Sequence, residues 1–225
     1  MNLARKKLLI VGDSAFAEIA CRYFERENKY QFVGFAVEKD YLKKDQLLGK
    51  PIYELEKIEN LFPPNTVTLF VAITYAKLNR LRTRIYKDLK SKGYKFAKYI
   101  SHYAYVDQET EIGENVFIFE NNTVQPFVTI KNNTILWSGN HIGHHSIINE
   151  NVFIASQVVI SGFCHIGENS FLGVNSTISN GIKIGKNNFI REGTIISSDT
   201  KEDSIFSPAE SLKSKVKASR FFRLK

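Results

Sequence analysis

The chain has 225 residues and a formal net charge of +8 at pH 7, with 43% hydrophobic and 24% charged residues. This composition is that of a globular protein, and it excludes a disordered or collagen-like chain. Residues 1–100 carry 20 basic and 11 acidic side chains, residues 101–200 carry 4 and 9, and residues 201–225 carry 7 and 3. The net charge therefore hides an acidic centre between two basic ends, and it does not by itself indicate nucleic acid.

The first hundred residues alternate apolar runs with helix-like segments, which predicts a small parallel sheet with ligands at the carboxyl ends of its strands. We expect strands at 7–11, 32–37 and 67–73, and helices at 18–27 and 76–92. The turn after the first strand has only Gly12 of the three glycines of a dinucleotide fingerprint. It is a weak nucleotide-binding motif, and a plain strand-turn-helix corner is the alternative. We expect the basic side chains of the second helix to face solvent, with no nucleic-acid partner.

A strict six-residue repeat fills the centre of the chain. Seventeen positions in steps of six, from Ile100 to Ile196, are all Ile, Val or Leu. A period of six is not helical and predicts very short strands, with the aliphatic side chain inward and Gly or Asn at the corners. The repeat resembles the hexapeptide repeat of the left-handed parallel β-helix family, in which three hexads form one triangular coil. The repeat alone predicts a prism and not an activity.

The combination of a small α/β domain and a hexapeptide prism resembles the sialic acid O-acetyltransferases and the N-acetyltransferases of bacillosamine and related nucleotide-linked dideoxy-amino sugars. The resemblance implies a Rossmann-like nucleotide-sugar domain at 1–99, a left-handed parallel β-helix at 100–200 and a basic tail at 201–225. It also implies acetyl-CoA as cosubstrate, bound in the groove between neighbouring prisms of a homotrimer. The expected activity is N-acetylation of a nucleotide-linked amino sugar for a bacterial surface glycan.

The family's catalytic signature is a histidine four residues before a hexad aliphatic, and His144 stands at that distance from Ile148. A neutral imidazole can accept the proton that the sugar amine loses as it attacks the thioester, so the resemblance implies that His144 is the general base. His145 replaces the acidic residue that often follows, so the His144 tautomer must be set in another way. His145 and His141 are further catalytic candidates. One coil later Gly162 takes the stacked position, where we expect open space beside the imidazole.

The resemblance also suggests binding residues. In the α/β domain, the candidates for nucleotide-sugar binding are Gly12, Asp13, Ser14, Glu38, Lys39, Thr74 and Tyr75. On the prism, the candidates for acetyl-CoA binding are Phe153, Gly162, Gly173, Asn175 and Arg191. Phe153 stands where some relatives have a second histidine, nine residues after the first. Lys39 stands where relatives have a second acid.

Other functions stay open at this point. Sugar O-acetylation uses the same base, and a non-catalytic prism or nucleotide-binding protein is the alternative of another class. A zinc carbonic anhydrase needs three histidine ligands in a spacing that the five histidines do not offer, so we expect no metal. A serine-acetyltransferase-like activity fits poorly with an α/β N-terminal domain. Cys21 and Cys164 lie in different predicted domains, and no signal or membrane-spanning run is seen, so we expect a cytoplasmic protein.

Overall fold

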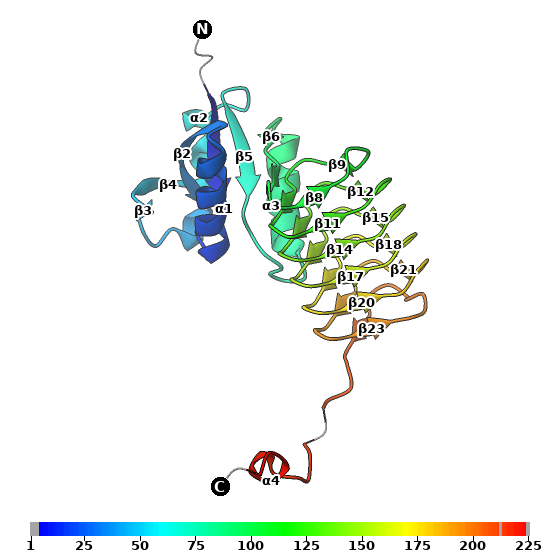
Figure 1. The fold of residues 1–225 in the computed structure, drawn as a ribbon. Helices are drawn as coiled ribbons and strands as arrows, with labels where there is room; N and C mark the ends of the chain where they lie inside the picture. The colour runs from blue at the N-terminus through cyan, green and yellow to red at the C-terminus, as the bar shows by residue number, and fades with distance from the viewer. Residues whose placement is uncertain (1–4, 212, 224–225) are drawn as a thin grey trace.

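The computed structural model describes residues 5–211 and 213–223 of the chain. An α/β part is followed by a triangular prism of stacked short strands and by a tail that leads away from the far end of the prism (Figure 1). The stacked parallel strands fit the left-handed β-helix predicted from the hexad repeat.

The α/β part is built on one six-stranded sheet in the order β3-β4-β2-β1-β5-β6, and all neighbours are parallel except β3 and β4. The three predicted strands are present at its centre, and the last of them ends two residues earlier than expected. The short strands β3, β4 and β6 were not predicted. The strand bounds are Lys6–Val11 (β1), Tyr30–Val37 (β2), Gln46–Leu47 (β3), Lys50–Glu54 (β4), Val67–Val71 (β5) and Lys95–Phe96 (β6).

Alternation of side chains along β1 gives the sheet two apolar faces. Leu8 and Ile10 pack into a core with α1, whereas Leu9 and Val11 pack into a second core with α3. The first core continues into the prism, because the rings of Phe16 and Phe117 are 5.5 Å apart. The helical segments are α1 (Ala15–Glu27), η1 (Lys39–Tyr41), η2 (Leu55–Lys57), α2 (Ile58–Leu61), α3 (Arg80–Ser91) and α4 in the tail (Ala218–Phe221).

The helix expected at 76–92 begins later than predicted, at Arg80. Lys77, Leu78 and Asn79 precede it with φ of 52°, 51° and 64°, which makes a left-handed turn of three residues that are not glycine. This conformation is costly for ordinary side chains and persists only where neighbouring contacts fix it. Here Asn79 is fully buried, and its amide donates to the carbonyl oxygens of Asn169 and Ser170 in the prism.

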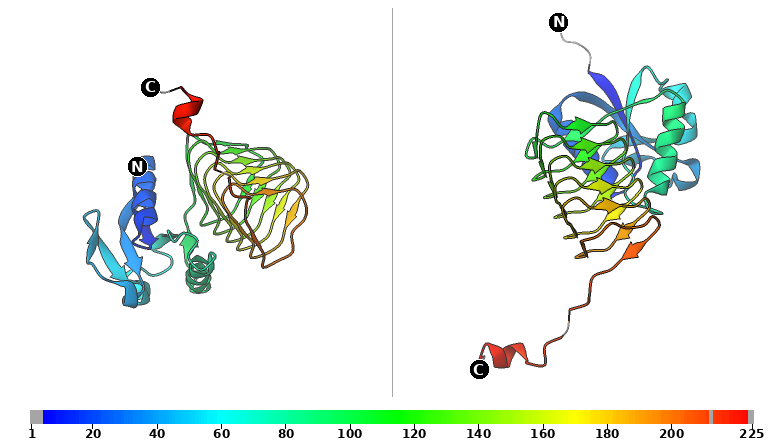
Figure 2. Two further views of the ribbon diagram at one scale, coloured as in Figure 1. Left: turned by 90° about the horizontal axis from the view of Figure 1, so that it is seen from below. Right: turned by 90° about the vertical axis from the view of Figure 1, so that its right-hand side faces the viewer.

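The prism has three faces, each a parallel sheet of two-residue strands, and the aliphatic residue of every hexad up to Ile196 closes a strand (Figure 2). Successive strands of a face are one coil apart, as Phe117 and its partner Ile135 show. Face 1 holds β7 (Tyr99–Ile100), β10 (Phe117–Ile118), β13 (Ile135–Leu136), β16 (Phe153–Ile154), β19 (Phe171–Leu172), β22 (Phe189–Ile190) and β24 (Ile205–Phe206). Face 2 holds β8 (Tyr105–Val106), β11 (Thr123–Val124), β14 (His141–Ile142), β17 (Val159–Ile160), β20 (Thr177–Ile178) and β23 (Ile195–Ile196). Face 3 holds β9 (Glu111–Ile112), β12 (Thr129–Ile130), β15 (Ile147–Ile148), β18 (His165–Ile166) and β21 (Lys183–Ile184).

Most corners use the residues that the sequence pattern suggested, asparagine or glycine, and four do not. From Ile118 to Ile196 a left-handed residue stands three places before each aliphatic. It is Asn at half of these corners and Gly at three (Gly139, Gly181 and Gly193), and the unexpected residues are Phe127, His145, Gln157 and Phe163. The glycines that follow the aliphatics are not left-handed. They are required by close stacking, since a Cβ on Gly143 would lie 2.5 Å from the backbone nitrogen of Gly162 in the next coil.

The α/β part docks on face 1 and on the edge between faces 3 and 1, which we call the asparagine edge after its corner residues Asn115, Asn133, Asn151, Asn169 and Asn187. Side-chain amides link Asn115 to Asn133 at 2.7 Å and Asn133 to Asn151 at 2.8 Å. The chain of the α/β part joins this ladder at several coils. The Val71 amide donates to Asn115 and the Arg80 guanidinium donates to Asn187.

Arg82 is the buried centre of this contact, which corrects the expectation that the basic face of the helix is solvated. Its side chain is 0% exposed and donates to the carbonyl oxygens of Ile73 and Thr74, and across the junction to those of Asn133, Asn151 and Val152. Burial lowers the pKa of Arg82 to about 9, so the group is still charged at neutral pH. Uncharged carbonyl oxygens therefore solvate a buried cation.

Cys21 and Cys164 are free and buried. Burial raises the pKa of the Cys21 thiol to about 12, and it also raises the pKa of the Cys164 thiol. Both thiols are therefore protonated at neutral pH, and neither is a nucleophile.

Replacing Arg82 by Met should lower the free energy of unfolding by about 3 kcal/mol, because several buried carbonyl oxygens lose their donor at once. Arg84→Met is the matched control in the same helix, since the Arg84 side chain is 57% exposed and bound to Glu38. We expect that control to change the stability by about 1 kcal/mol or less. Denaturant titration monitored by tryptophan fluorescence measures both. Equal effects would contradict the assigned role of Arg82.

Candidate functional site

A pocket of about 240 Å³ opens at the carboxyl ends of β1, β2 and β5. It brings together five of the seven residues predicted to bind the nucleotide sugar: Gly12, Asp13, Ser14, Glu38 and Thr74. Gly12 has φ of 124°, and a Cβ there would lie 2.8 Å from the Ala72 carbonyl oxygen, so only glycine fits this turn. The N-terminus of α1 follows at once, and the Ser14 side chain makes no capping hydrogen bond to it. The mouth of the pocket thus presents helix amide groups, which favour anions.

The charged groups of this pocket are paired. Glu38 accepts two hydrogen bonds from Arg84, at 2.9 and 2.8 Å, and this contact raises the pKa of Arg84. Asp13 lies 3.8 Å from the ammonium of Lys44. Lys39, which was predicted beside Glu38, has an exposed side chain that does not line the pocket. Only the acidic member of that predicted pair therefore faces the pocket.

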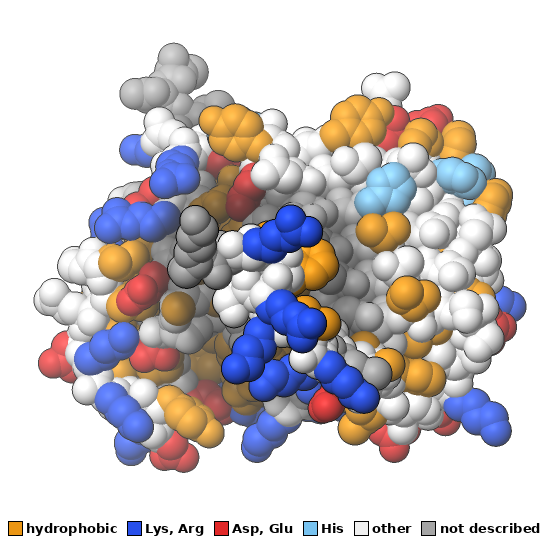
Figure 3. Space-filling model, turned by 60° about the horizontal axis from the view of Figure 1, so that its bottom comes forward, with side chains coloured by type: hydrophobic (Ala, Val, Ile, Leu, Met, Phe, Trp, Pro, Cys, Tyr) orange, Lys and Arg blue, Asp and Glu red, His pale blue; other side chains and the backbone are white. Residues whose placement is uncertain are grey.

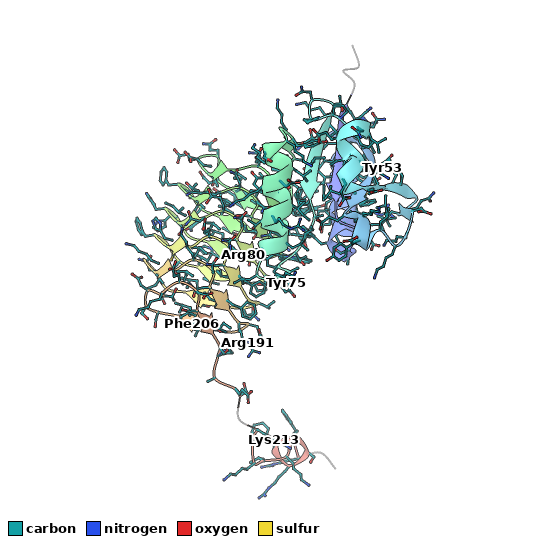
Figure 4. The ribbon with its side chains drawn as sticks, turned by 180° about the vertical axis from the view of Figure 1, so that it is seen from behind. Tyr53, Tyr75, Arg80, Arg191, Phe206 and Lys213 are labelled. Atoms are coloured by element: carbon teal, nitrogen blue, oxygen red, sulfur yellow. The ribbon has the colours of Figure 1, made fainter. Side chains whose placement is uncertain are left out.

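Tyr75 is separated from the other predicted sugar-binding residues and lies at the junction with the prism (Figure 4). Its ring packs on Phe153 and Phe171, with centroid distances of 5.1 and 4.8 Å. Half of Tyr75 is exposed, whereas Phe153 beneath it is 3% exposed. The structure therefore places Phe153 in the contact between the two parts of the chain and does not bring it to His144.

Two surface grooves meet at Tyr75. One, of about 610 Å³, runs over the edge between faces 1 and 2, where Gly173 and Asn175 line it together with Glu192. The other, of about 490 Å³, is lined by Ala76, Lys77 and Leu78 of the left-handed turn and by residues of the last coils. Ala76 also lines the pocket at the strand ends. The loop after β5 is thus shared by the pocket and both grooves. Arg191, predicted to bind acetyl-CoA, lines neither groove and pairs with Glu192 at 3.1 Å.

The catalytic candidates His144 and His145 lie on the edge between faces 2 and 3, which we call the histidine edge and which also holds Phe127 and Phe163. His144 is half-buried, and its backbone N–H donates to the Gln125 side chain at 2.9 Å. Its ring lies over Gly162, since a Cβ on that glycine would stand 2.8 Å from Cε1 and 2.9 Å from Nε2. We expected open space beside the imidazole at Gly162. In the structure the imidazole itself fills that space.

His145 contacts the same ring from the side. The Nδ1 atoms of His144 and His145 are 3.1 Å apart, and the two ring planes are nearly perpendicular. His141 lies apart from this pair, on the flat surface of face 2 between Thr123 and Val159 of the neighbouring strands. The histidine edge therefore unites His144, His145 and Gly162, and it leaves His141 outside.

Three residues of the histidine edge were not predicted. Gln125 holds the backbone of His144, and Phe163 packs edge-on against its ring at 4.9 Å. The Asn180 side-chain oxygen lies 3.2 Å from the place that a Cβ on Gly162 would take. Phe163 and Asn180 stand one and two coils after His145 and His144, so stacking the sequence in coils would have brought them together.

The pocket and the histidine edge lie on opposite sides of one chain. The α/β part covers face 1 and the asparagine edge, and the histidine edge is the one edge of the triangle that does not border face 1. In the space-filling view, histidine side chains lie on the flank of the prism away from the α/β part (Figure 3). A single chain therefore does not join the pocket to His144.

Comparison with known proteins supports the resemblance seen in the sequence. Residues 96–198 match the family described as the GMPPB C-terminal domain. No curated protein matches the chain closely enough to count as a relative. Within the described ranges no helix is long and apolar enough to cross a membrane, and no group of three or more His, Cys, Asp or Glu side chains is placed to hold a metal ion.

Three solved structures share the fold over nearly the whole chain. The acetyltransferase domain of PglB from Neisseria gonorrhoeae, in complex with acetyl coenzyme A, has a TM-score of 0.81 and 20% identity, covering 93% of this chain and 100% of that one. PerB from Caulobacter crescentus, in complex with CoA and GDP-perosamine, has a TM-score of 0.80 and 20% identity over 91% and 95%. WeeI from Acinetobacter baumannii has a TM-score of 0.78 and 17% identity over 89% and 95%. The predicted likeness to the hexapeptide-repeat sugar acetyltransferases is thus confirmed at the level of the fold.

Proposed function

We propose that the protein transfers the acetyl group of acetyl-CoA to the amine of a nucleotide-linked, dideoxy-type amino sugar. The observation that carries this proposal is the presence, on a fold shared with PglB and PerB, of both a strand-end pocket and a histidine seated on a glycine. The PerB structure contains CoA together with GDP-perosamine. A role in making a bacterial surface glycan and a cytoplasmic location are parts of the same prediction.

The pocket suits the nucleotide end of such a substrate. Gly12 brings the backbone close, the α1 N-terminus favours the phosphates, and Glu38 offers an acceptor for hydroxyl groups. The sugar would leave the pocket over Ala76 towards Tyr75. Its amine must then reach a base. We propose Asp13, Ser14 and Thr74 as further contacts in this pocket, with Lys39 at its outer rim.

His144 is the base in this proposal. Acetyl-CoA supplies the acetyl group as a thioester. We propose the exposed Asn175 and the prism edges at Gly162 and Gly173 as its contacts. The amine nitrogen attacks the thioester carbon, the carbon–sulfur bond breaks and CoA leaves as a thiolate. Nε2 of His144 accepts the proton that the amine loses and passes it to the leaving sulfur. The glycine beneath the ring fits this role, because any side chain at Gly162 would displace the imidazole.

The base and the pocket are proposed to come from different chains of a homotrimer. The histidine edge faces away from the pocket of its own chain, so a neighbouring prism must present its own His144 to a bound sugar. This arrangement also leaves the groove at Tyr75, Gly173 and Asn175 to face a second chain.

The experiment that tests the function is an acceptor panel. UDP-, dTDP- and GDP-linked 3- or 4-amino-6-deoxy sugars are incubated with acetyl-CoA, and thiol release is followed. Turnover of at least one amino sugar supports the proposal. Turnover of a hydroxyl acceptor alone would indicate an O-acetyltransferase, and binding of nucleotide sugars without turnover would indicate a non-catalytic protein.

His144→Ala should lower kcat by about 10²-fold or more with little change in either KM, because the general base is lost while binding is kept. His165→Ala is the matched control, since His165 is another exposed imidazole of the prism, on face 3 one coil further along. That control should keep the full rate. An unchanged kcat in His144→Ala would exclude the base role.

Ser14→Trp should raise KM for the nucleotide sugar by about tenfold or more while KM for acetyl-CoA stays the same, because an indole fills the pocket mouth. Ser14 makes no capping bond, so the fold should not suffer. Lys43→Trp places the same side chain on an exposed site outside the pocket and serves as control. Co-assembly of Ser14→Trp and His144→Ala chains should restore activity to part of the sites, because each chain supplies what the other lacks. No recovery in mixed trimers would contradict a site shared between chains.

A further inference from the structure

The geometry points to His145 as a positioning residue that fixes the tautomer and orientation of the His144 imidazole. This inference rests on the proposed function of His144 as base. Its central observation is the 3.1 Å distance between the two Nδ1 atoms. At that distance the two nitrogens share one hydrogen, so one of them donates and the other accepts.

The base role decides which nitrogen donates. For His144 to accept a proton at Nε2, its own Nδ1 must carry the hydrogen of the neutral ring. That N–H then points at Nδ1 of His145, which accepts, and the second hydrogen of the pair lies on Nε2 of His145. When Nε2 of His144 takes the proton from the amine, the bond between the two rings becomes charge-assisted and stronger. His145 thus supplies the acceptor that a carboxylate would otherwise supply.

The fold holds His145 in place for this task. His145 is the left-handed corner residue of its coil, with φ of 58°. Its ring is stacked on Phe163 at 4.9 Å, with the planes 23° apart, and it packs against Phe127 at 4.7 Å from the other side. Phe127 and Phe163 are the corner residues of the preceding and following coils, and each is 52% exposed. The three rings form a column that fixes the plane of His145.

Phe163 also constrains His144 directly, because its ring meets the His144 ring edge-on at 4.9 Å and 88°. The His144 imidazole is therefore bounded by His145 and Phe163 and by Gly162 in the coil below. The uncharged side chains of Gln125 and Asn180 complete its surroundings. Among the hydrogen bonds and ring contacts of the described residues, His145 is the titratable partner of this ring.

Two variants separate positioning from packing. His145→Phe keeps an aromatic ring at a corner where the coils on both sides already hold phenylalanine, but it removes the acceptor. His145→Asp restores an acceptor, and the left-handed corner tolerates aspartate, as Asp203 shows at φ of 56°. We expect kcat to fall by about 10²-fold in His145→Phe with both KM values unchanged, and to be largely kept in His145→Asp.

The pH profile of kcat/KM gives a readout that a packing role would not move. A carboxylate beside His144 favours its protonated form, so the acid-side loss of activity should begin at higher pH in His145→Asp than in the wild type. A phenyl ring gives no such support, so the loss should begin at lower pH in His145→Phe. Identical profiles in all three proteins would overturn the positioning role.

A measurement on the full-length protein without substrates keeps this test independent of the proposed function. In protein labelled with ¹⁵N-histidine, the His144 signals, assigned by their absence in His144→Ala, should show a protonated Nδ1 and a bare Nε2 at a pH where the ring is neutral. His145→Phe should lose this preference, and His145→Asp should keep it. A bare Nδ1 in the wild type would overturn the inference even if the enzyme is active. Full loss of activity in His144→Ala with none in His145→Phe would leave the base role intact and reject the positioning role.

Discussion

The arrangement of the molecule depends on one buried cation. The guanidinium of Arg82 lies between the α/β part and the prism and is solvated only by carbonyl oxygens and by the Asn79 side chain. A charge without water is costly unless its hydrogen bonds are complete, so both parts must keep their carbonyl groups in register around it. Because two of these groups belong to Ile73 and Thr74, the same cation also fixes the loop that lines the pocket at the strand ends.

The asparagine edge extends this constraint along the prism. A left-handed corner residue must tolerate positive φ, and asparagine does so while its amide can bond to the next coil. The ladder from Asn115 through Asn133 to Asn151 satisfies the amides in this way. The α/β part binds the asparagine edge at both ends, at Asn115 and at Asn187. On the histidine edge the same corner positions hold aromatic rings, which leave the polar atoms of His144 and His145 to each other. One backbone geometry thus supports a docking edge and a candidate catalytic edge.

The hexad pattern predicted the prism because aliphatic spacing responds directly to burial, and every predicted aliphatic closes a strand. The left-handed corners were harder to predict, since Phe127 and Gln157 occupy them without any intrinsic preference. The buried state of Arg82 could not be read from the helix, because a basic residue looks solvated until its partner surface is known. Phe153 was assigned from a place in a motif, while its surroundings are set by Tyr75, which is distant in the sequence. The stacking of His144 on Gly162 was predicted, because two residues 18 positions apart lie in successive coils and this spacing can be counted in the sequence.

The contact between α3 and the asparagine edge brings two periodic objects together. Strand spacing advances a coil by about 4.8 Å, and three residues of an α-helix advance about 4.5 Å, so the two scales nearly coincide. Arg80 meets Asn187, and Thr83, three residues further along the helix, meets Asn169, one coil earlier in the prism. By geometry alone the helix could slip by one coil and three residues. Such a slip would set Ile85 where Arg82 stands, against carbonyl oxygens that need a donor. The spacings alone allow a series of registers between helix and prism. The need of these carbonyl oxygens for a donor selects the one register that places Arg82 against them.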